Sequence, residues 1–265
     1  MASAADLQDP VGNAIATGAP AALAAKAEQP WPRIFVLAVL AGAFIAFGSV
    51  AALVAQANMG DGGAVRLISG AAFSVGLMMV MIVGAELFTG NTMMMLPATT
   101  GDLTVGRMLG AWTTVWLGNL LGALIVAFLF AAAGGLDDGV GDAAIALAVG
   151  KLAKSPGAVF ASGILANMLV CLAVWMSMAA LTLPAKILAV LGPVMIFVAA
   201  GLEHSIANMS IIPLGWLAAP GDGLPLGAGA LNLIFSTLGN IVGGAMTALA
   251  IAYGHDAMRL KEIDR

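Results

Sequence analysis

Two short stretches of this chain place ionisable and amide side chains inside very apolar sequence. "GAELFTGN" at 84–91 and "GLEHSIAN" at 201–208 both read Gly-x-Glu-x-x-x-x-Asn. Their polar side chains are Glu86, Thr89 and Asn91 in the first stretch and Glu203, His204 and Asn208 in the second. Imidazole exchanges a proton near neutral pH, and hydroxyls and amides hydrogen-bond a solute. Because ionisable groups in apolar segments are costly and usually line a pathway, the pattern indicates a polar site within an apolar medium.

The composition places that medium in a membrane. Of 265 residues, 61% are hydrophobic and 9% are charged, and the mean hydropathy is +1.03. That leaves too little polar surface to coat a water-soluble domain. The net charge of −4 is confined to loops and ends, and nothing in it indicates a nucleic-acid partner. Cys171 is the only cysteine, so no disulfide framework is expected.

Charge-free runs predict an all-α membrane protein with six transmembrane helices. About 20 apolar residues cross the hydrocarbon core, and four runs are long enough for whole helices: 34–60, 108–136, 155–185 and 223–255. The two polar stretches divide 67–100 and 187–219, which we expect to be broken helices. A lipid-facing β-barrel would need alternating segments, which this sequence lacks. We therefore expect a channel domain over 33–255 between cytoplasmic tails at 1–32 and 256–265, the first of them mobile.

A second pair of similar segments indicates an internal repeat. "LGNLLG" at 117–122 matches "LGNIVG" at 238–243, in the same order relative to the two polar stretches. A unit of three helices used twice must insert the second time upside down, which gives an inverted 3+3 repeat. Unwound backbone at membrane depth survives only beside protein or a water-filled cavity. The two breaks should meet near the midplane, where the N-termini of half-helices favour an anion.

The distribution of basic residues predicts both termini in the cytoplasm. With six crossings, one side carries seven lysines and arginines: Lys26, Arg33, Arg107, Lys186, Arg259, Lys261 and Arg265. The other side carries three, Arg66, Lys151 and Lys154. The excess marks the cytoplasmic side.

These motifs resemble the formate/nitrite transporter family. The resemblance rests on "GAELFTGNTM", "GLEHSIANM", "GILANMLVCLAVWMS" at 163–177 and "WLGNLLGAL" at 116–124, and it covers about 33–255. It implies an aquaporin-like protomer, a homopentamer in the bacterial inner membrane, and one pore per protomer for formate, nitrite or hydrosulfide. Partners would be the small anion and membrane lipid, without a cofactor or a bound metal.

The resemblance also assigns roles to single residues. It makes His204 the central pore histidine, with Thr89 hydrogen-bonded beside it, and places Lys151 in a vestibule. Counting from the motifs, hydrophobic constrictions fall on Phe73 and Leu77 on one side and on Phe197 on the other. The asparagine of "GILAN" is Asn167. On spacing alone, the aromatic positions are equally consistent with ordinary packing.

The remaining polar residues are expected to support the breaks. A carboxylate facing the pore would repel an anion, so Glu86 and Glu203 should accept hydrogen bonds from N–H groups freed at the breaks or pair with Lys151. Asn91 and Asn208 should serve similar bonds. Asn119 and Asn240 are expected to tie the two repeats together. For Lys154, a loop charge and a functional role are both open.

Two other functions fit parts of this pattern. An aquaporin-type channel for neutral solutes also has six spans but carries paired Asn-Pro-Ala motifs, whereas this chain has Leu-Pro-Ala at 96–98 and 183–185. A haem-bearing subunit would need pairs of histidines in the membrane, and only His204 lies in a span. No nucleophile and base recur at a shared site, so an enzyme is not expected.

Overall fold

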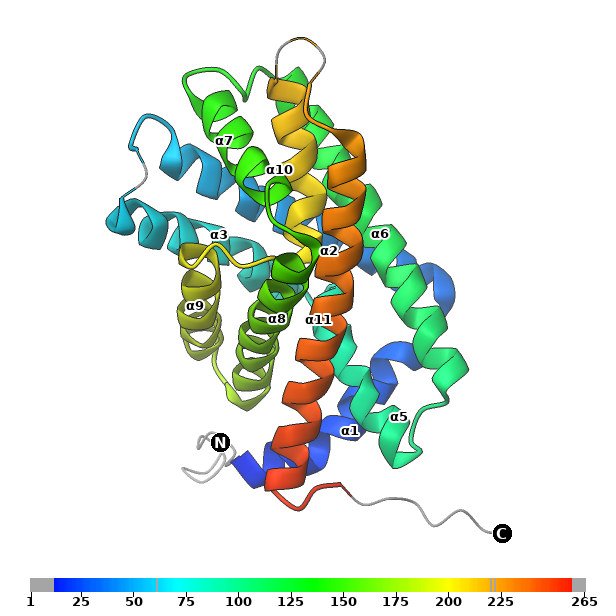
Figure 1. Ribbon diagram of the computed structural model, residues 1–265. Coiled ribbons are helices and arrows are strands. Elements are labelled where there is room, and N and C mark those ends of the chain that lie inside the picture. The colour runs from blue at the N-terminus through cyan, green and yellow to red at the C-terminus, as the bar shows by residue number, and fades with distance from the viewer. Residues whose placement is uncertain (1–11, 61, 220, 222, 259–265) are drawn as a thin grey trace.

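The computed structural model describes residues 12–60, 62–219, 221 and 223–258, and within these ranges it is entirely helical. Figure 1 shows the helices as a bundle in which long elements flank several short ones. In chain order they are α1 (Gly12–Glu28), α2 (Trp31–Gln56), α3 (Gly63–Val83), α4 (Phe88–Asn91), the 3-10 turn η2 (Thr92–Met94), α5 (Met95–Thr100), α6 (Val105–Ala132), α7 (Val140–Leu152), α8 (Pro156–Ala179), α9 (Leu183–Ala199), α10 (Ser205–Ala218) and α11 (Leu226–Gly254).

Five of the described helices are long and apolar enough to cross a membrane: α2, α3, α6, α8 and α11. α9 and α10 are shorter apolar helices that follow one another along the chain. Large apolar side chains remain exposed along these helices, among them Phe128, Leu188 and Leu226. Lipid or another protein chain accommodates such surfaces, whereas water does not. The chain is therefore a multi-pass membrane protein.

Both predicted interruptions are present. α3 ends at Val83 and is capped by Gly84, whose φ of +75° is left-handed, and the chain is non-helical until α4 begins at Phe88. The second interruption lies between α9 and α10 and contains Gly201 with φ +64°. Glycine adopts such angles without the steric cost that a Cβ atom brings. The glycines that open the two polar stretches therefore end each preceding helix.

Glycines in the "LGN-x-x-G" segments let helix pairs approach closely. On α6, a Cβ atom at Gly122 would overlap the carbonyl of Val39 on α2. On α11, a Cβ atom at Gly243 would overlap the carbonyl of Ile164 on α8. Small residues allow this backbone contact between helices in membranes. The helices of each pair, α2–α6 and α8–α11, are consequently in close backbone contact.

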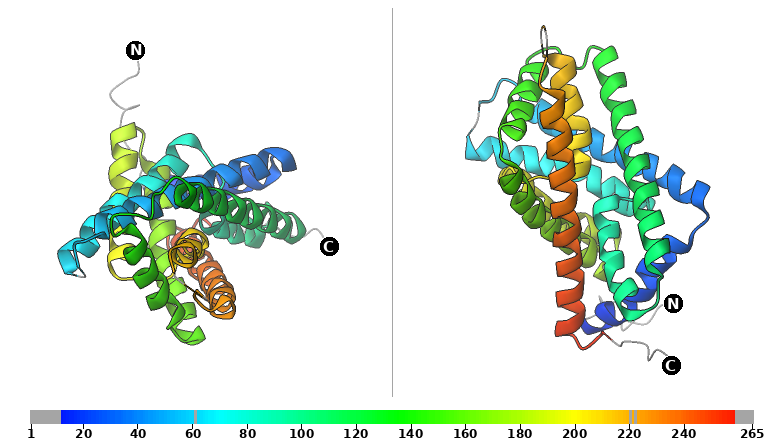
Figure 2. Two further views of the ribbon diagram at one scale, coloured as in Figure 1. Left: turned by 90° about the horizontal axis from the view of Figure 1, so that it is seen from above. Right: turned by 45° about the vertical axis from the view of Figure 1, so that its right-hand side comes forward.

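The expected mobile tail is wrong for residues 12–28, which form α1. Its buried residues include Ala16, Ala19, Leu23 and Ala27, and the first three join a cluster with Ala248 and Ala252 of α11. Figures 1 and 2 place α1 across the end of the bundle where α11 ends. The alanine-rich sequence of α1 has little apolar periodicity of its own, so its order comes from packing against η2, α5, α8 and α11. Residues 1–11 lie outside the described residues.

Arg107 of α6 fixes the end of α1. Its Nε donates to the carbonyl of Ala27 at 2.7 Å and its Nη2 to that of Gln29 at 2.6 Å. The guanidinium also lies 3.6 Å from the ring centre of Trp31, in a cation–π contact. These contacts turn the chain from α1 into α2. Of the basic residues used to predict orientation, Arg259, Lys261 and Arg265 lie outside the described residues.

Candidate functional site

Two asparagines hold the interrupted backbone in the same way. At the first break, Asn119 accepts from the N–H of Phe88 at 2.9 Å and donates to the carbonyls of Ala38 and Glu86 at 2.7 and 2.9 Å. At the second break, Asn240 accepts from the N–H of Ser205 at 2.8 Å. It donates to the carbonyls of Gly163 and Glu203 at 2.8 and 3.0 Å. Each amide thus satisfies one N–H and one C=O of a break, which the missing helical turn leaves free, and ties them to a carbonyl inside a neighbouring helix, α2 or α8.

These bonds test two expectations from the sequence. Asn119 and Asn240 were expected to tie the repeats together, but each binds backbone of its own half of the chain. Glu86 and Glu203 were expected either to accept from freed backbone N–H groups or to pair with Lys151; both carboxylates bind side chains, and Glu203 does pair with Lys151. An amide carries both a donor and an acceptor, so one side chain can satisfy the N–H and the C=O groups at a break.

Glu86 lies in a cluster that includes the end of α1. Its carboxylate, 1% exposed, accepts from Lys26 at 3.0 Å, from Gln29 at 3.0 Å and from Asn91 at 2.9 Å. We call Lys26, Gln29, Glu86 and Asn91 the α1-side cluster. Lys26 and Gln29 were missed from the sequence because they lie about sixty residues before Glu86, in the segment taken for a tail.

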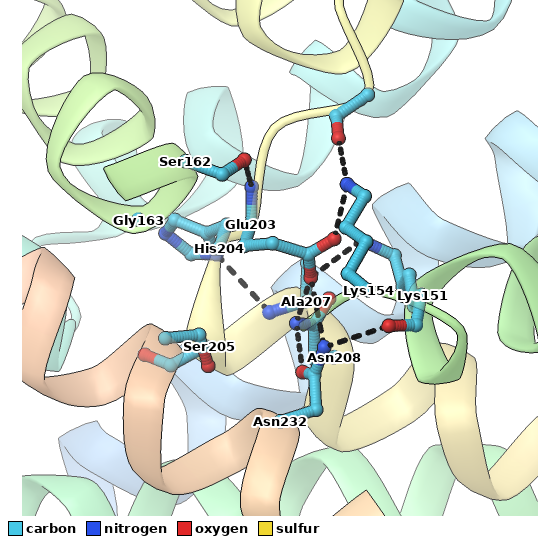
Figure 3. Close-up of polar contacts among 12 residues, drawn as sticks. Lys151, Lys154, Ser162, Gly163, Glu203, His204, Ser205, Ala207, Asn208 and Asn232 are labelled. Atoms are coloured by element: carbon cyan, nitrogen blue, oxygen red, sulfur yellow. Dashed lines mark hydrogen bonds and ion pairs between the residues drawn. The ribbon is translucent and has the colours of Figure 1, made fainter. Parts of the chain in front are cut away.

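Glu203 lies in a second cluster, drawn in Figure 3. Its carboxylate is fully buried and pairs with Lys151 at 3.2 Å and with Lys154 at 2.6 Å. Asn208 donates to the same carboxylate at 2.7 Å, and Asn232 of α11 donates at 3.3 Å. We call Lys151, Lys154, Glu203, Asn208 and Asn232 the α7-side cluster, because α7 carries Lys151. The expected pair between Glu203 and Lys151 is present.

His204 and Thr89 bring the two breaks into contact. His204 Nε2 lies 2.9 Å from Thr89 Oγ1, and both side chains are buried. His204 Nδ1 accepts from the N–H of Ala207 at 3.1 Å, so the ring also caps the N-terminus of α10. A ring nitrogen that accepts carries no proton, which places the proton of the neutral ring on Nε2. Nε2 then donates to Thr89 and leaves the hydroxyl hydrogen of Thr89 free to donate.

Aromatic rings stack onto this pair from one direction. Phe197 is stacked on His204 with ring centres 5.6 Å apart, and Phe73 meets Phe197 edge-on, also at 5.6 Å. The sequence assigned these two phenylalanines to opposite sides of the pore, and that assignment is wrong because the rings touch. Leu77, one turn beyond Phe73 on α3, instead lines a separate cavity.

Asn167 links the two halves of the chain behind this pair. Its Nδ2 donates to the carbonyl of Thr89 at 3.1 Å, to Thr92 Oγ1 at 2.9 Å and to the carbonyl of Asn240 at 2.6 Å. Its Oδ1 is buried without a protein partner in the described structure. Three acceptors around Nδ2 fix the amide orientation, so Oδ1 is left as a buried acceptor without a protein donor.

Two cavities flank the site. One of about 150 Å³ has largely apolar walls that include Leu77 and Val80, and it reaches Lys26 and Asn91 of the α1-side cluster. The other, of about 60 Å³, is lined by Lys151, Lys154 and Asn232 of the α7-side cluster and by apolar residues of α7, α8 and α11. At least one lysine therefore lines each cavity. Among the described residues, no group of three or more His, Cys, Asp or Glu is arranged to hold a metal ion.

Comparisons with known proteins agree on one family. The model of the formate/nitrite transporter family matches residues 13–254. A probable formate transporter of Methanothermobacter thermautotrophicus is 38% identical over 244 residues, covering 83% of this chain and 88% of that protein. The formate channel FocA of Escherichia coli (strain K12) is 34% identical over 257 residues, covering 86% of this chain and 90% of FocA.

Solved structures show the same similarity in three dimensions. A pentameric formate channel with formate bound superposes with a TM-score of 0.77 at 33% identity, covering 84% of this chain and 96% of that one. An FNT family ion channel superposes with a TM-score of 0.82 at 32% identity, covering 92% and 98% of the two chains. The similarity therefore extends over nearly the whole length of each solved chain.

Proposed function

The chain belongs to the formate/nitrite transporter family, and we propose that it conducts small monovalent anions of the size of formate or nitrite between the two helix breaks. The observation that carries this proposal is the contact of Thr89 with His204, one from each break, between cavities that each reach a lysine. As in other members of the family, the role is transport and not enzymatic catalysis.

The proposed architecture is an inverted repeat of two three-helix units with six crossings, in an aquaporin-like arrangement. It is supported by the matching bonds of Asn119 and Asn240, each made from a helix that is packed through glycine on its neighbour. The channel domain spans 33–255, and both termini face the cytoplasm of the inner membrane. Similarity to a pentameric formate channel supports a homopentamer with one pore per protomer.

In the proposed pathway the anion meets a charge, an apolar passage and a hydrogen-bond donor in turn. Lys151 attracts it on one side, and Phe73, Phe197 and Leu77 narrow the apolar passage. Desolvation of an anion is costly, and an apolar constriction opposes a hydrated ion more than a weakly hydrated solute. The free hydroxyl hydrogen of Thr89 offsets part of that cost at the narrowest place. Asn167 Oδ1 offers an acceptor nearby for a protonated form of the solute.

The hydrogen bonds of His204 bear on proton coupling. A protonated Nδ1 cannot accept from Ala207, so charging the ring breaks the cap of α10. With this cap formed, the neutral ring acts by orienting Thr89. A second proton can bind the ring only at Nδ1, and it can do so only when the hydrogen bond from Ala207 is broken. Glu86 and Glu203 pair with the lysines and, with Asn91 and Asn208, hold the breaks without facing the anion.

Flux into proteoliposomes tests this function. The purified protein should conduct formate, nitrite and hydrosulfide and exclude glycerol, because a neutral polyol gains nothing from the lysines. Phe197→Ala should widen the passage and relax selectivity among the anions, whereas Leu188→Ala, an exposed site on the same helix, should not. Rapid glycerol entry without anion flux would favour the aquaporin-type alternative and refute the proposal.

A further inference from the structure

The two glutamate clusters differ in charge. In the α1-side cluster the carboxylate of Glu86 contacts one ammonium group, that of Lys26. Its other donor from the end of α1 is the neutral amide of Gln29. In the α7-side cluster one carboxylate meets two ammonium groups. The first cluster is therefore formally neutral and the second carries one positive charge.

The positive charge of the α7-side cluster depends on Lys154. Both lysines contact the one carboxylate of Glu203, Lys154 at 2.6 Å and Lys151 at 3.2 Å, and the Lys154 side chain is the more exposed, at 31% against 8%. Without Lys154, the remaining pair of Lys151 and Glu203 would be formally neutral, and the field of a neutral pair falls off quickly with distance. With Lys154 present, the cluster keeps one net positive charge, which acts over a longer range.

Lys154 is also held firmly in place. Its Nζ donates to the carbonyl of Gly201, in the second break, at 2.7 Å and to Glu203 at 2.6 Å. An ammonium has three N–H donors, and within the described structure the third has no protein acceptor. Figure 3 shows the ammonium groups of Lys154 and Lys151 converging on the Glu203 carboxylate. Both lysines line the 60 Å³ hollow together with Asn232.

We propose that this hollow is a reception site for a small monovalent anion and that Lys154 gives the site its net positive charge. Lys151 and Lys154 both line the hollow and share one carboxylate, and Lys154 adds the positive charge that Glu203 does not balance, together with a fixed donor. The hollow suits a species of three or four atoms, such as a carboxylate without a side chain or a nitrogen oxyanion. This inference rests on the proposed function and adds the residue that recruits the anion.

The field of one ammonium sets the expected size of the effect. At about 6 Å and an effective dielectric constant between about 40 and 80, one unit charge concentrates a monovalent anion roughly threefold to tenfold. Salt screens that attraction when the Debye length shrinks to the separation of the charges. Saturating anion fills the site without help from the charge, so recruitment shows only at low anion concentration.

The test measures initial formate influx into proteoliposomes at sub-saturating formate, in about 10 mM and about 500 mM potassium gluconate. Lys154→Gln should lower influx about threefold to tenfold at low salt and little at high salt. Lys154→Arg, which keeps the charge, should behave as wild type. So should Lys186→Gln, which removes the same charge at the far end of α9.

Two results would overturn the inference alone, both with normal flux in the wild type. In the first, influx through Lys154→Gln equals that of the wild type at both salt concentrations. In the second, Lys154→Gln loses the same fraction of influx at both salt concentrations. The second result would mean that Lys154 only supports the break through Gly201. Absence of formate influx in the wild type would instead refute the proposed function, and the reception site with it.

Discussion

Replacing the amide that holds each break should destabilise the protein by a similar amount in both halves. Asn240→Leu keeps a side chain of similar size but removes the hydrogen bonds to Ser205, Gly163 and Glu203. Each buried backbone group left without a partner costs about 1–3 kcal/mol. The N–H of Ser205 and the C=O of Glu203 are two such groups, and with the lost third bond, to a carbonyl inside α8, the total cost is about 3–5 kcal/mol. Asn119→Leu should cost the same, because its three bonds have the same chemistry and nearly the same lengths.

The assay is thermal unfolding of the detergent-purified protein. For a chain of this size, a loss of about 3–5 kcal/mol lowers the midpoint by roughly 10 °C. Thr247→Val on α11 is the matched control, since it removes a buried hydroxyl that bonds only within its own helix, and it should shift the midpoint by only a few degrees. If Asn119→Leu or Asn240→Leu shifted the midpoint no more than this control, the explanation of how the breaks are held would be refuted.

Three further predictions concern other contacts. Arg107→Ala removes two hydrogen bonds and a cation–π contact at the end of α1, so limited proteolysis should cut α1 faster than in wild type; equal rates would contradict the role of Arg107. Gly244→Ala would drive a Cβ atom into Thr92 and should reduce yield and thermal stability, whereas Gly157→Ala, with open space around it, should not; a stable Gly244→Ala protein would contradict this packing. Cys171 is fully buried, so a maleimide should leave the mass of the folded protein unchanged and modify it after denaturation; labelling of the folded protein would contradict its burial.

Much of the fold could be predicted because the membrane simplifies the sequence pattern. Charge-free runs mark the long helices, and glycine followed by a lone glutamate marks each break, since few residues tolerate a left-handed turn and ions are rare in spans. The central pair of Thr89 and His204 came from family resemblance, and its contact is present at 2.9 Å. Its role in transport stays a prediction.

The parts that the sequence did not reveal depend on contacts between distant residues. Which amides hold the breaks could not be read from spacing, because Asn119 reaches the first break from a different helix. The partner of Glu86 was missed because Lys26 lies on α1, whose order comes from packing on several other helices and not from its own pattern. α7 was also not anticipated, because its sequence was read as a loop between two spans. The contact of Phe73 with Phe197 requires two helices to meet side by side, which residue counting within each helix does not capture.

The central claim is that the anion passes the hydrogen-bonded pair of His204 and Thr89, and formate flux through His204→Asn tests it most directly. Asparagine is a good N-cap residue, so it should keep the cap on Ala207 while removing the imidazole N–H that orients Thr89. The account predicts that His204→Asn folds and that its formate influx differs from that of the wild type at least tenfold. A loss of the wild-type anion selectivity, or of the wild-type dependence of influx on pH, would also agree with the account. Influx equal to wild type across pH and across formate and nitrite would contradict it.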